Sequence, residues 1–165
     1  MGQGRRAEDV YVALAPAVLG YIRAERVPDA EDVLGEVFLQ VTRDVDRFQG
    51  DDPALRRWVF TIAHNRVIDD VRRRTRRPVR LVDRVPERAA SPAAAPFDPA
   101  LVAALHELTP GQREVVVLRF VADLSIDDVA ALTKQTPGAV KAMQHRALER
   151  LATCVSPDAP AALTE

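Results

Sequence analysis

The side chains best placed to do chemistry in this sequence are arginines gathered into one stretch. Residues 56–80 carry nine arginines and two aspartates, whereas residues 1–55 carry six arginines and eleven acidic residues. The densest part contains Arg72, Arg73, Arg74, Arg76 and Arg77. Each of these could neutralise one phosphate, which predicts a polyanion as the ligand. The alternative is a solvated helix end, where the helix dipole favours arginine.

A second candidate for nucleic-acid binding is the segment 125–151, whose pattern predicts a helix-turn-helix. Ser125 can cap a short first helix, and Thr136 can cap a second helix that begins at Pro137 and ends near Leu151. Three polar side chains would project outward from the second helix, as in a recognition helix in a major groove. These are Lys141, His145 and Arg146. The alternative is a small three-helix core with a solvated outer face.

Catalytic and metal-binding patterns are missing from the sequence. The three histidines lack the spacing of metal ligands, and there is no nucleophile, paired-carboxylate or glycine-loop signature. A single cysteine, Cys154, excludes an intramolecular disulfide and a multi-cysteine metal site. We therefore expect no enzyme activity, no metal and no cofactor. Because no apolar run or signal-peptide pattern is present, we expect a cytoplasmic protein without membrane insertion.

Helical periodicity runs through the chain and no segment alternates as a strand, so the expected fold class is all-α. A first helix is predicted over 8–25, with Pro16 as a kink or break. Its apolar stripe would contain Tyr11, Leu14, Val18 and Ile22. A second helix begins after Pro28, with Asp29 as its N-cap. Its inward face would be formed by Leu34, Val37, Phe38, Val41, Val45 and Phe48.

A third helix is predicted over 54–74, after a turn at 49–53. Its apolar side would contain Phe60, Ala63, Val67 and Val71. Its opposite side would carry Asn65, Asp69, Arg72 and Arg73. This helix is therefore expected to have both a core face and a basic face.

A stretch rich in proline and alanine divides the chain. Five prolines and no helical periodicity occur between residues 78 and 100. We expect two small helical domains, 8–77 and 98–152, joined by a linker at 78–97 and followed by a tail at 153–165. The second domain would place Leu101, Leu105 and Leu108 toward a core and open its next helix with a capping box from Thr109 to Gln112.

The order of these parts resembles the extracytoplasmic-function sigma factors of bacterial RNA polymerase. Four stretches carry the resemblance: DAEDVLGEVFLQVTRDVDRFQG, LRRWVFTIAHNRVIDDVRRRTRR, LHELTPGQREVVVLRFVADLSIDDVAAL and TPGAVKAMQHRALERL. The resemblance as a whole covers essentially residues 10–152, and these stretches stand in the family's order. The resemblance implies a two-domain initiation factor that binds core polymerase, selects promoters and captures melted strand. The alternatives are a conventional helix-turn-helix regulator and a helical adaptor that sequesters another factor.

The resemblance also implies partners and site residues. The partners would be core polymerase, with its β and β′ subunits, promoter DNA and an anti-sigma factor. The polymerase-binding stripe would be Asp29, Asp32, Glu36 and Gln40. The minus-ten element would be bound by Phe48, Asp51, Phe60, Asn65, Arg66, Arg72 and Arg73. The minus-35 element would be bound by Lys141, His145 and Arg146. Phe48 and Phe60 also continue apolar stripes, so packing is the alternative role for both.

The sequence departs from the family pattern at three places. Gly35 stands where the family usually has glutamine, and a glycine inside a helix costs up to about 1 kcal/mol against alanine. The loop before the third helix is one residue longer, which puts the roles of Asp51 and Asp52 in question. The recognition helix differs from the family's usual T-V-K-S-R-L-H-R, so the sequence leaves open whether Met143 or Gln144 faces DNA.

Overall fold

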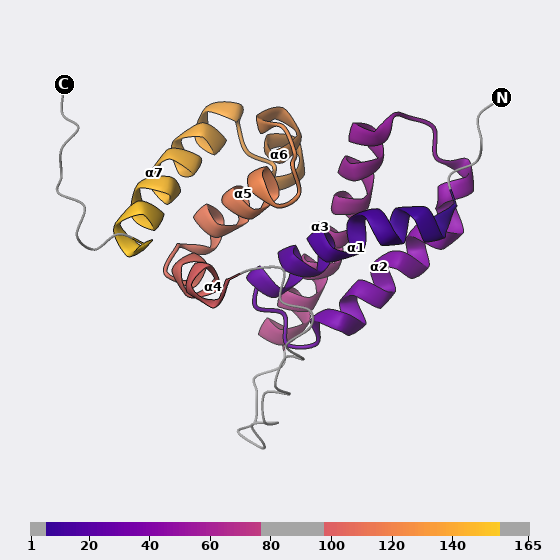
Figure 1. The fold of residues 1–165 in the computed structure, drawn as a ribbon, viewed down its shortest axis with the longest axis horizontal. Helices are drawn as coiled ribbons and strands as arrows, with labels where there is room; N and C mark the ends of the chain where they lie inside the picture. The colour runs from indigo at the N-terminus through magenta and orange to yellow at the C-terminus, as the bar shows by residue number, and fades with distance from the viewer. Residues whose placement is uncertain (1–5, 77–97, 156–165) are drawn as a thin grey trace, which may run out of the picture.

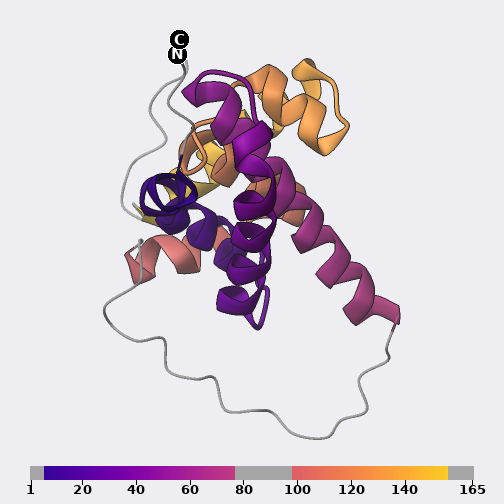
Figure 2. The same ribbon diagram turned by 90° about the vertical axis from the view of Figure 1, so that its right-hand side faces the viewer.

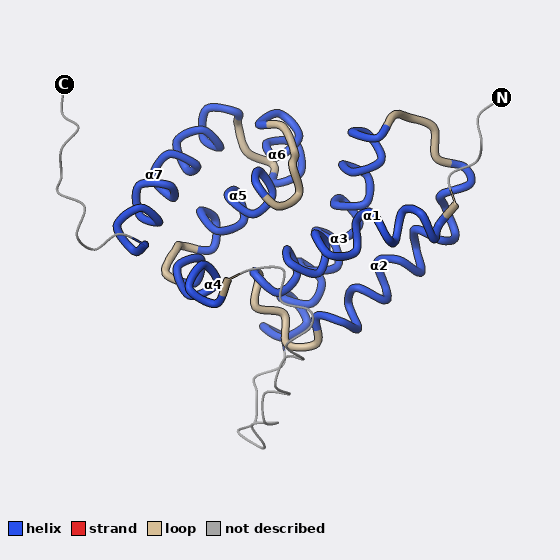
Figure 3. The backbone as a smooth tube through the Cα atoms, in the orientation of Figure 1, coloured by secondary structure: helices blue, strands red, loops and turns tan. Residues whose placement is uncertain are grey.

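Seven α-helices form the regular structure of the computed structural model, together with one short 3-10 turn (Figures 1 and 3). The structure describes residues 6–76 and 98–155. In these residues there is no strand, which confirms the all-α fold class. The predicted linker at 78–97 and residues 156–165 of the predicted tail lie outside the described residues. No helix in the described part is long and apolar enough to cross a membrane.

The first helix, α1 (Ala7–Ala24), runs through Pro16 without a break. Pro16 is exposed, so water can satisfy the carbonyl that loses its partner. Leu14, Val18 and Ile22 are buried as predicted, but Tyr11 is 48% exposed and that prediction was wrong. Because α1 packs against more than one helix, its buried stripe is wider and includes Val10 and Tyr21. The Tyr11 ring lies at the edge of this stripe, edge-on to Phe38.

The second helix, α2 (Ala30–Asp44), continues into the 3-10 turn η1 (Val45–Arg47). Asp29 occupies the N-cap position as predicted, but its side chain makes no capping hydrogen bond. Five members of the predicted inward face are buried: Leu34, Val37, Phe38, Val41 and Val45. Phe48 is only partly buried, because the chain leaves η1 in an extended conformation and carries the ring to the edge of the core.

The third helix, α3 (Asp52–Arg76), is two residues longer at each end than predicted. Phe60, Ala63 and Val67 are buried, whereas Val71 is 44% exposed and was wrongly assigned to the core. The reason is geometric, because the C-terminal end of α3 extends beyond α1 and α2 (Figure 2). Every side chain from residue 71 to residue 76 is exposed.

The second half of the chain contains α4 (Pro99–His106), α5 (Pro110–Phe120), α6 (Ile126–Thr133) and α7 (Pro137–Val155). Its predicted caps are all present. Ser125 accepts a hydrogen bond from the Asp128 amide at 3.0 Å, and Thr136 accepts one from the Ala139 amide at 3.2 Å. Thr109 and Gln112 form the complete capping box. Lys134, in the left-handed conformation, ends α6 and makes the turn of the helix-turn-helix.

The core of this half lies between α5, α6 and α7. Its fully buried members include Val115, Leu118, Val129, Val140 and Ala147. Of the predicted core leucines, Leu105 and Leu108 are buried, but Leu101 is 38% exposed on the first turn of α4. Helix α7 ends at Val155, four residues beyond its predicted end.

The two halves pack against one another, with α1 contacting α4 and α5 and α3 contacting α6 (Figures 1 and 2). Arginines on α3 supply two of the polar links. Arg56 donates to the Ala122 carbonyl at 3.2 Å, and Arg57 pairs with Asp128 at 3.0 Å. Burial raises the pKa of Asp128, but hydrogen bonds from Arg57 and Ser125 outweigh this and hold it below its ordinary value. These contacts join α3 directly to the helix-turn-helix.

Candidate nucleic-acid interface

The basic end of α3 is an exposed charged surface. Asn65, Asp69, Arg72 and Arg73 are all exposed, as predicted for the polar side of this helix. Arg72, Arg73 and Arg76 surround a shallow hollow with Asp69 at its edge. A hollow lined by three arginines can accept a phosphate by charge-assisted hydrogen bonds. Arg77, which the sequence adds to this cluster, lies outside the described residues.

One arginine of this end is already paired within the helix. Arg74 lies 2.7 Å from Asp70, one turn earlier in α3. This pairing fits the expected alternative, in which arginines simply support the end of a helix. The arginines at 72 and 73 are therefore the better candidates for contact with a polyanion.

An aromatic pair stands beside the loop that precedes α3. The rings of Phe48 and Trp58 stack with centroids 5.2 Å apart and an interplanar angle of 28°. A Cβ at Gly50 would lie only 2.9 Å from the tip of the Phe48 ring and 3.0 Å from Ala54, so glycine lets the loop close over this ring. Both aromatic rings are partly buried, so an edge of the stack is accessible.

Asp51 and Phe60 have structural environments. Asp51 Oδ1 accepts a hydrogen bond from the Ala54 amide at 2.9 Å, which makes it the cap of α3. Phe60 has no exposed surface and lies edge-on to Tyr21, with ring centroids 6.1 Å apart. The structure therefore puts Phe60 in the core, where its ring offers no face on which a base could stack.

Trp58 is a residue of this surface that was not among the predicted minus-ten residues. It lies seven residues before Asn65, and two helical turns bring both to one side of α3, about 10 Å apart along the axis. The Trp58 side chain is partly buried, in the stack with Phe48. The seven-residue spacing was the available signal.

The predicted polymerase stripe lies on the outer side of α2. Asp29, Asp32 and Glu36 are exposed, and Gln40 is partly buried. Arg66 of α3 reaches this stripe, lying 3.6 Å from the Glu36 carboxylate and donating to Gln40 at 3.3 Å. The structure thus brings a residue expected at the minus-ten element onto the stripe expected to bind polymerase. A Cβ at Gly35 would meet nothing within 4 Å, so this glycine leaves an open space in the stripe.

The outer face of α7 carries the three predicted recognition residues. Lys141, His145 and Arg146 are exposed. His145 lies 3.2 Å from Glu149, one turn later in the helix. One side of α7 packs on the core and the other side is exposed, so the helix could enter a major groove.

Met143 and Gln144 are both turned partly toward α5. Met143 packs against the core, and Gln144 accepts a hydrogen bond from Arg119 Nε at 3.0 Å. Arg119 also donates to the carbonyl of Leu124, so one guanidinium ties α5 to the α5–α6 turn and to α7. This link could not be predicted from local sequence, because it joins residues 25 apart.

Comparisons with known proteins give matches in both halves. A family model described as Sigma-70 region 2 matches residues 10–77, and one described as Sigma-70, region 4 matches residues 99–151. The chain is 35% identical over 158 residues to the RNA polymerase sigma factor CarQ of Myxococcus xanthus, covering 87% of this chain and 86% of that protein. It is 32% identical over 164 residues to the ECF RNA polymerase sigma factor SigD of Mycobacterium tuberculosis, covering 91% and 77%.

Two solved structures share the fold. The sigma factor RpoE in complex with the anti-sigma factor NepR from Bartonella quintana aligns with a TM-score of 0.70 and 24% identity, covering 92% of this chain and 98% of that one. CnrH in complex with the cytosolic domain of CnrY aligns with a TM-score of 0.61 and 22% identity, covering 93% and 89%.

Proposed function

The chain belongs to the sigma-70 family as an ECF RNA polymerase sigma factor, and we propose that three separate surfaces divide its work in promoter recognition. As a transcription initiation factor, it is not an enzyme. Its partner in this role is core polymerase. The residues that meet polymerase and each promoter element are our proposal, and so is the division into domains 8–77 and 98–152 joined by residues 78–97.

The first surface is the stripe on α2, which we assign to the β and β′ subunits of core polymerase. Asp32 and Glu36 are exposed and lie four residues apart, so both carboxylates point to the same side of the helix. A basic partner would be complementary to them. Arg66 partly neutralises Glu36 in the free chain, and docking would compete with this contact.

The second surface is on α3 and meets the minus-ten element. The observation that supports this assignment is that Asn65 is exposed on the same side of α3 as Trp58, whose ring stacks on Phe48. Exposed arginines follow toward the C-terminal end of the helix. An extruded base needs a stacking surface and polar groups that read its edge. Asn65 supplies the polar group, and the Phe48–Trp58 pair supplies the aromatic edge. Arg72 and Arg73 bind phosphates, while Asp51 holds the start of α3.

The third surface is the outer face of α7, which meets the minus-35 element through Lys141, His145 and Arg146. Gln144 and Met143 face α5 and set the angle at which these three project. An anti-sigma factor is a further proposed partner. Two proteins with this fold were solved in complexes: the sigma factor RpoE with the anti-sigma factor NepR, and CnrH with the cytosolic domain of CnrY. We place the protein in the cytoplasm, where core polymerase works.

The test of this assignment is transcription in vitro with purified core polymerase and a genomic promoter library. Wild type should direct initiation from a subset of promoters. A variant with Asp32→Arg and Glu36→Arg should lose affinity for core polymerase by at least about 100-fold, because each reversed charge would face a like charge. A control with Asp46→Arg and Glu107→Arg makes the same charge change at two other exposed positions.

The helical circular dichroism signal should be the same in all three proteins, because none of the four positions is in the core. Wild-type affinity of the stripe variant in a pull-down would remove the stripe from the proposal. Binding of wild type to duplex promoter DNA without polymerase, at physiological salt, would favour a conventional regulator instead.

A further inference from the structure

A cluster of polar side chains lies buried between the two halves of the chain. At its centre is His64 of α3, which is only 4% exposed. Its Nδ1 lies 2.9 Å from Glu114 Oε1 of α5 and 3.0 Å from the hydroxyl of Tyr21 of α1. Because a carboxylate oxygen can only accept, Nδ1 carries the hydrogen in this contact. One imidazole therefore joins α1 and α3 of the first half to α5 of the second.

Glu25, at the C-terminal end of α1, adds a second carboxyl group to this cluster. Its Oε1 is buried and has no hydrogen-bond partner among the described residues. The pKa of Glu25 is raised from 4.5 to about 7: burial raises it most, the negative charge of Glu114 also raises it, and the charge of Arg113 lowers it. Burial, Glu114 and Glu25 also raise the pKa of Tyr21, so its hydroxyl keeps its proton.

The second half contributes an arginine and a histidine to the same region. Arg113 of α5 is only 6% exposed, and its Nε has no partner among the described residues. His106, at the end of α4, lies beside Arg26, whose guanidinium donates to the His106 carbonyl at 3.2 Å. Burial lowers the pKa of His106, and the charges of Arg26 and Arg113 lower it further.

These contacts make packing of the halves depend on a proton. With the halves packed, two partly buried carboxyl groups act on one another, and a proton on Glu25 removes one of two like charges. With the halves apart, Glu25 returns to water and loses the repulsion from Glu114, so it ionises at its ordinary value. The packed arrangement therefore binds a proton that the separated arrangement releases.

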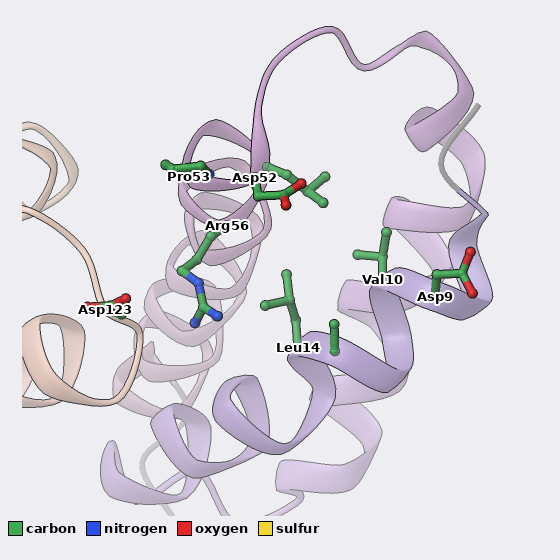
Figure 4. Close-up of a pocket in the computed structure, with 9 residues that line it drawn as sticks. Asp9, Val10, Leu14, Asp52, Pro53, Arg56 and Asp123 are labelled. Carbon is green, nitrogen blue, oxygen red and sulfur yellow. The ribbon is translucent and has the colours of Figure 1, made fainter. Parts of the chain in front are cut away.

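We propose that Tyr21, Glu25, His64 and Glu114 form a proton-linked latch, which holds the two halves together when Glu25 is protonated and releases them as the pH rises. A hollow of about 470 Å³ lies between α1 and the start of α3, with Asp123 of the second half at its edge (Figure 4).

The functional consequence rests on the proposed function. The minus-ten and minus-35 elements are centred about 25 base pairs apart, which is about 85 Å of duplex. A packed chain of this length is only about 40 Å across. The packed arrangement thus cannot reach both elements, and the latch keeps the factor in a form that must open before it can use a promoter.

The sign of the pH effect follows from the two shifts. Glu25 has a raised pKa, so its contribution to packing is complete below pH 4.5 and is lost as the pH rises through about 7. Between pH 6 and pH 8 this amounts to about a tenfold change in the ratio of packed to separated chains. His106 has a lowered pKa, so it acts in the opposite direction, and weakens packing as the pH falls below 6.5.

The test is single-molecule energy transfer in the full chain between dyes at Cys154, the chain's one cysteine, and an introduced Asp46→Cys. In the wild-type background the packed, high-transfer population should fall from pH 6 to pH 8. The variant Glu25→Gln cannot ionise, so its packed population should exceed wild type at pH 8. The ratio of the two proteins' packing constants should change about tenfold over this range, because His106 is present in both.

Glu107→Gln is the matched control, since it makes the same change at an exposed position directly after α4 and should follow wild type. Circular dichroism would reveal a misfolded variant, and a His106→Gln background, which lacks the opposing titration, would then let the pH series decide the question without Glu25→Gln. A ratio of wild-type to Glu25→Gln packing constants that does not change between pH 6 and pH 8 would overturn the latch, because His106 acts alike in both proteins. Neither measurement involves polymerase or DNA, so failure here is distinct from failure of the proposed function.

Discussion

The two helices that we assign to DNA, α3 and α7, present their polar side chains from different kinds of support. The basic end of α3 extends past its core, with Val71 44% exposed and Arg72 and Arg73 in solvent. Helix α7 is held more fully, because Val140 and Ala147 are completely buried beneath its outer face and Gln144 is tied to Arg119.

This difference separates two ways of meeting a nucleic acid. Arginines on a projecting helix end can follow a phosphate backbone, and such contacts position the protein without reading sequence. Side chains held at fixed angles on a packed helix can instead match the edges of particular bases. Asn65 stands between these cases, because it is exposed but lies on the part of α3 that the core still supports.

Removing the charge of the projecting end gives the largest effect that we expect on DNA binding. The double substitution Arg72→Ala and Arg73→Ala should weaken holoenzyme binding to all promoters by about 25- to 60-fold at 0.1 M salt, if each arginine meets one phosphate. The slope of log affinity against log salt should fall by about one to two. Arg43→Ala with Arg47→Ala removes the same charge from exposed positions on α2 and η1 and is the control. An unchanged salt slope would show that these arginines meet no phosphate.

Substitutions of base-reading residues should distinguish α3 from α7 more clearly, because each should affect only one promoter element. Asn65→Ala should flatten discrimination at one minus-ten position, and Arg146→Ala should do so within the minus-35 element, each by about 1–3 kcal/mol against the wrong base. Permanganate footprinting on a panel of single-base promoter variants measures both. If the Asn65→Ala protein opens all minus-ten promoter variants in the same order of efficiency as wild type, then Asn65 is a structural or phosphate-binding residue.

Local chemistry made much of this molecule predictable. The caps at Ser125, Thr109 and Thr136 depend on residues three positions away, so the sequence displays them directly. The core face of α2 was equally visible, because helical spacing records burial when one side is covered. Tyr11 and Val71 were misplaced because periodicity shows which residues share a face, but not how wide that face is or where the core ends.

Contacts between distant residues account for most of what the sequence could not show. Arg66 with Glu36, Arg119 with Gln144 and His64 with Glu114 join different helices. Each of these residues looks like an ordinary surface side chain in its own helix. Only the packing of the helices decides that Arg66 turns to α2 and that His64 is buried. The exposure of the polar sides of α2 and α7 was predictable from the sequence, whereas the polar cluster between the halves was not.

The smallest effect that we expect concerns the two caps that begin these helices, Asp51 for α3 and Thr136 for α7. Asp51→Ala and Thr136→Ala should each cost about 1 kcal/mol, because an amide in the first turn loses its acceptor. For a chain of this size that lowers the melting temperature by about 2–4 °C. Asp51→Asn and Thr136→Ser retain an oxygen that can cap, so both should melt close to wild type.

Asp51→Asn also separates capping from DNA contact. Asparagine can replace the capping oxygen, but it removes the negative charge and adds a donor. If Asp51 only holds α3, Asp51→Asn should leave the ranking of minus-ten variants unchanged while Asp51→Ala weakens all of them alike. A changed ranking at wild-type stability would instead place Asp51 against a base, and would extend the reading surface of α3 from Asn65 back into its own cap.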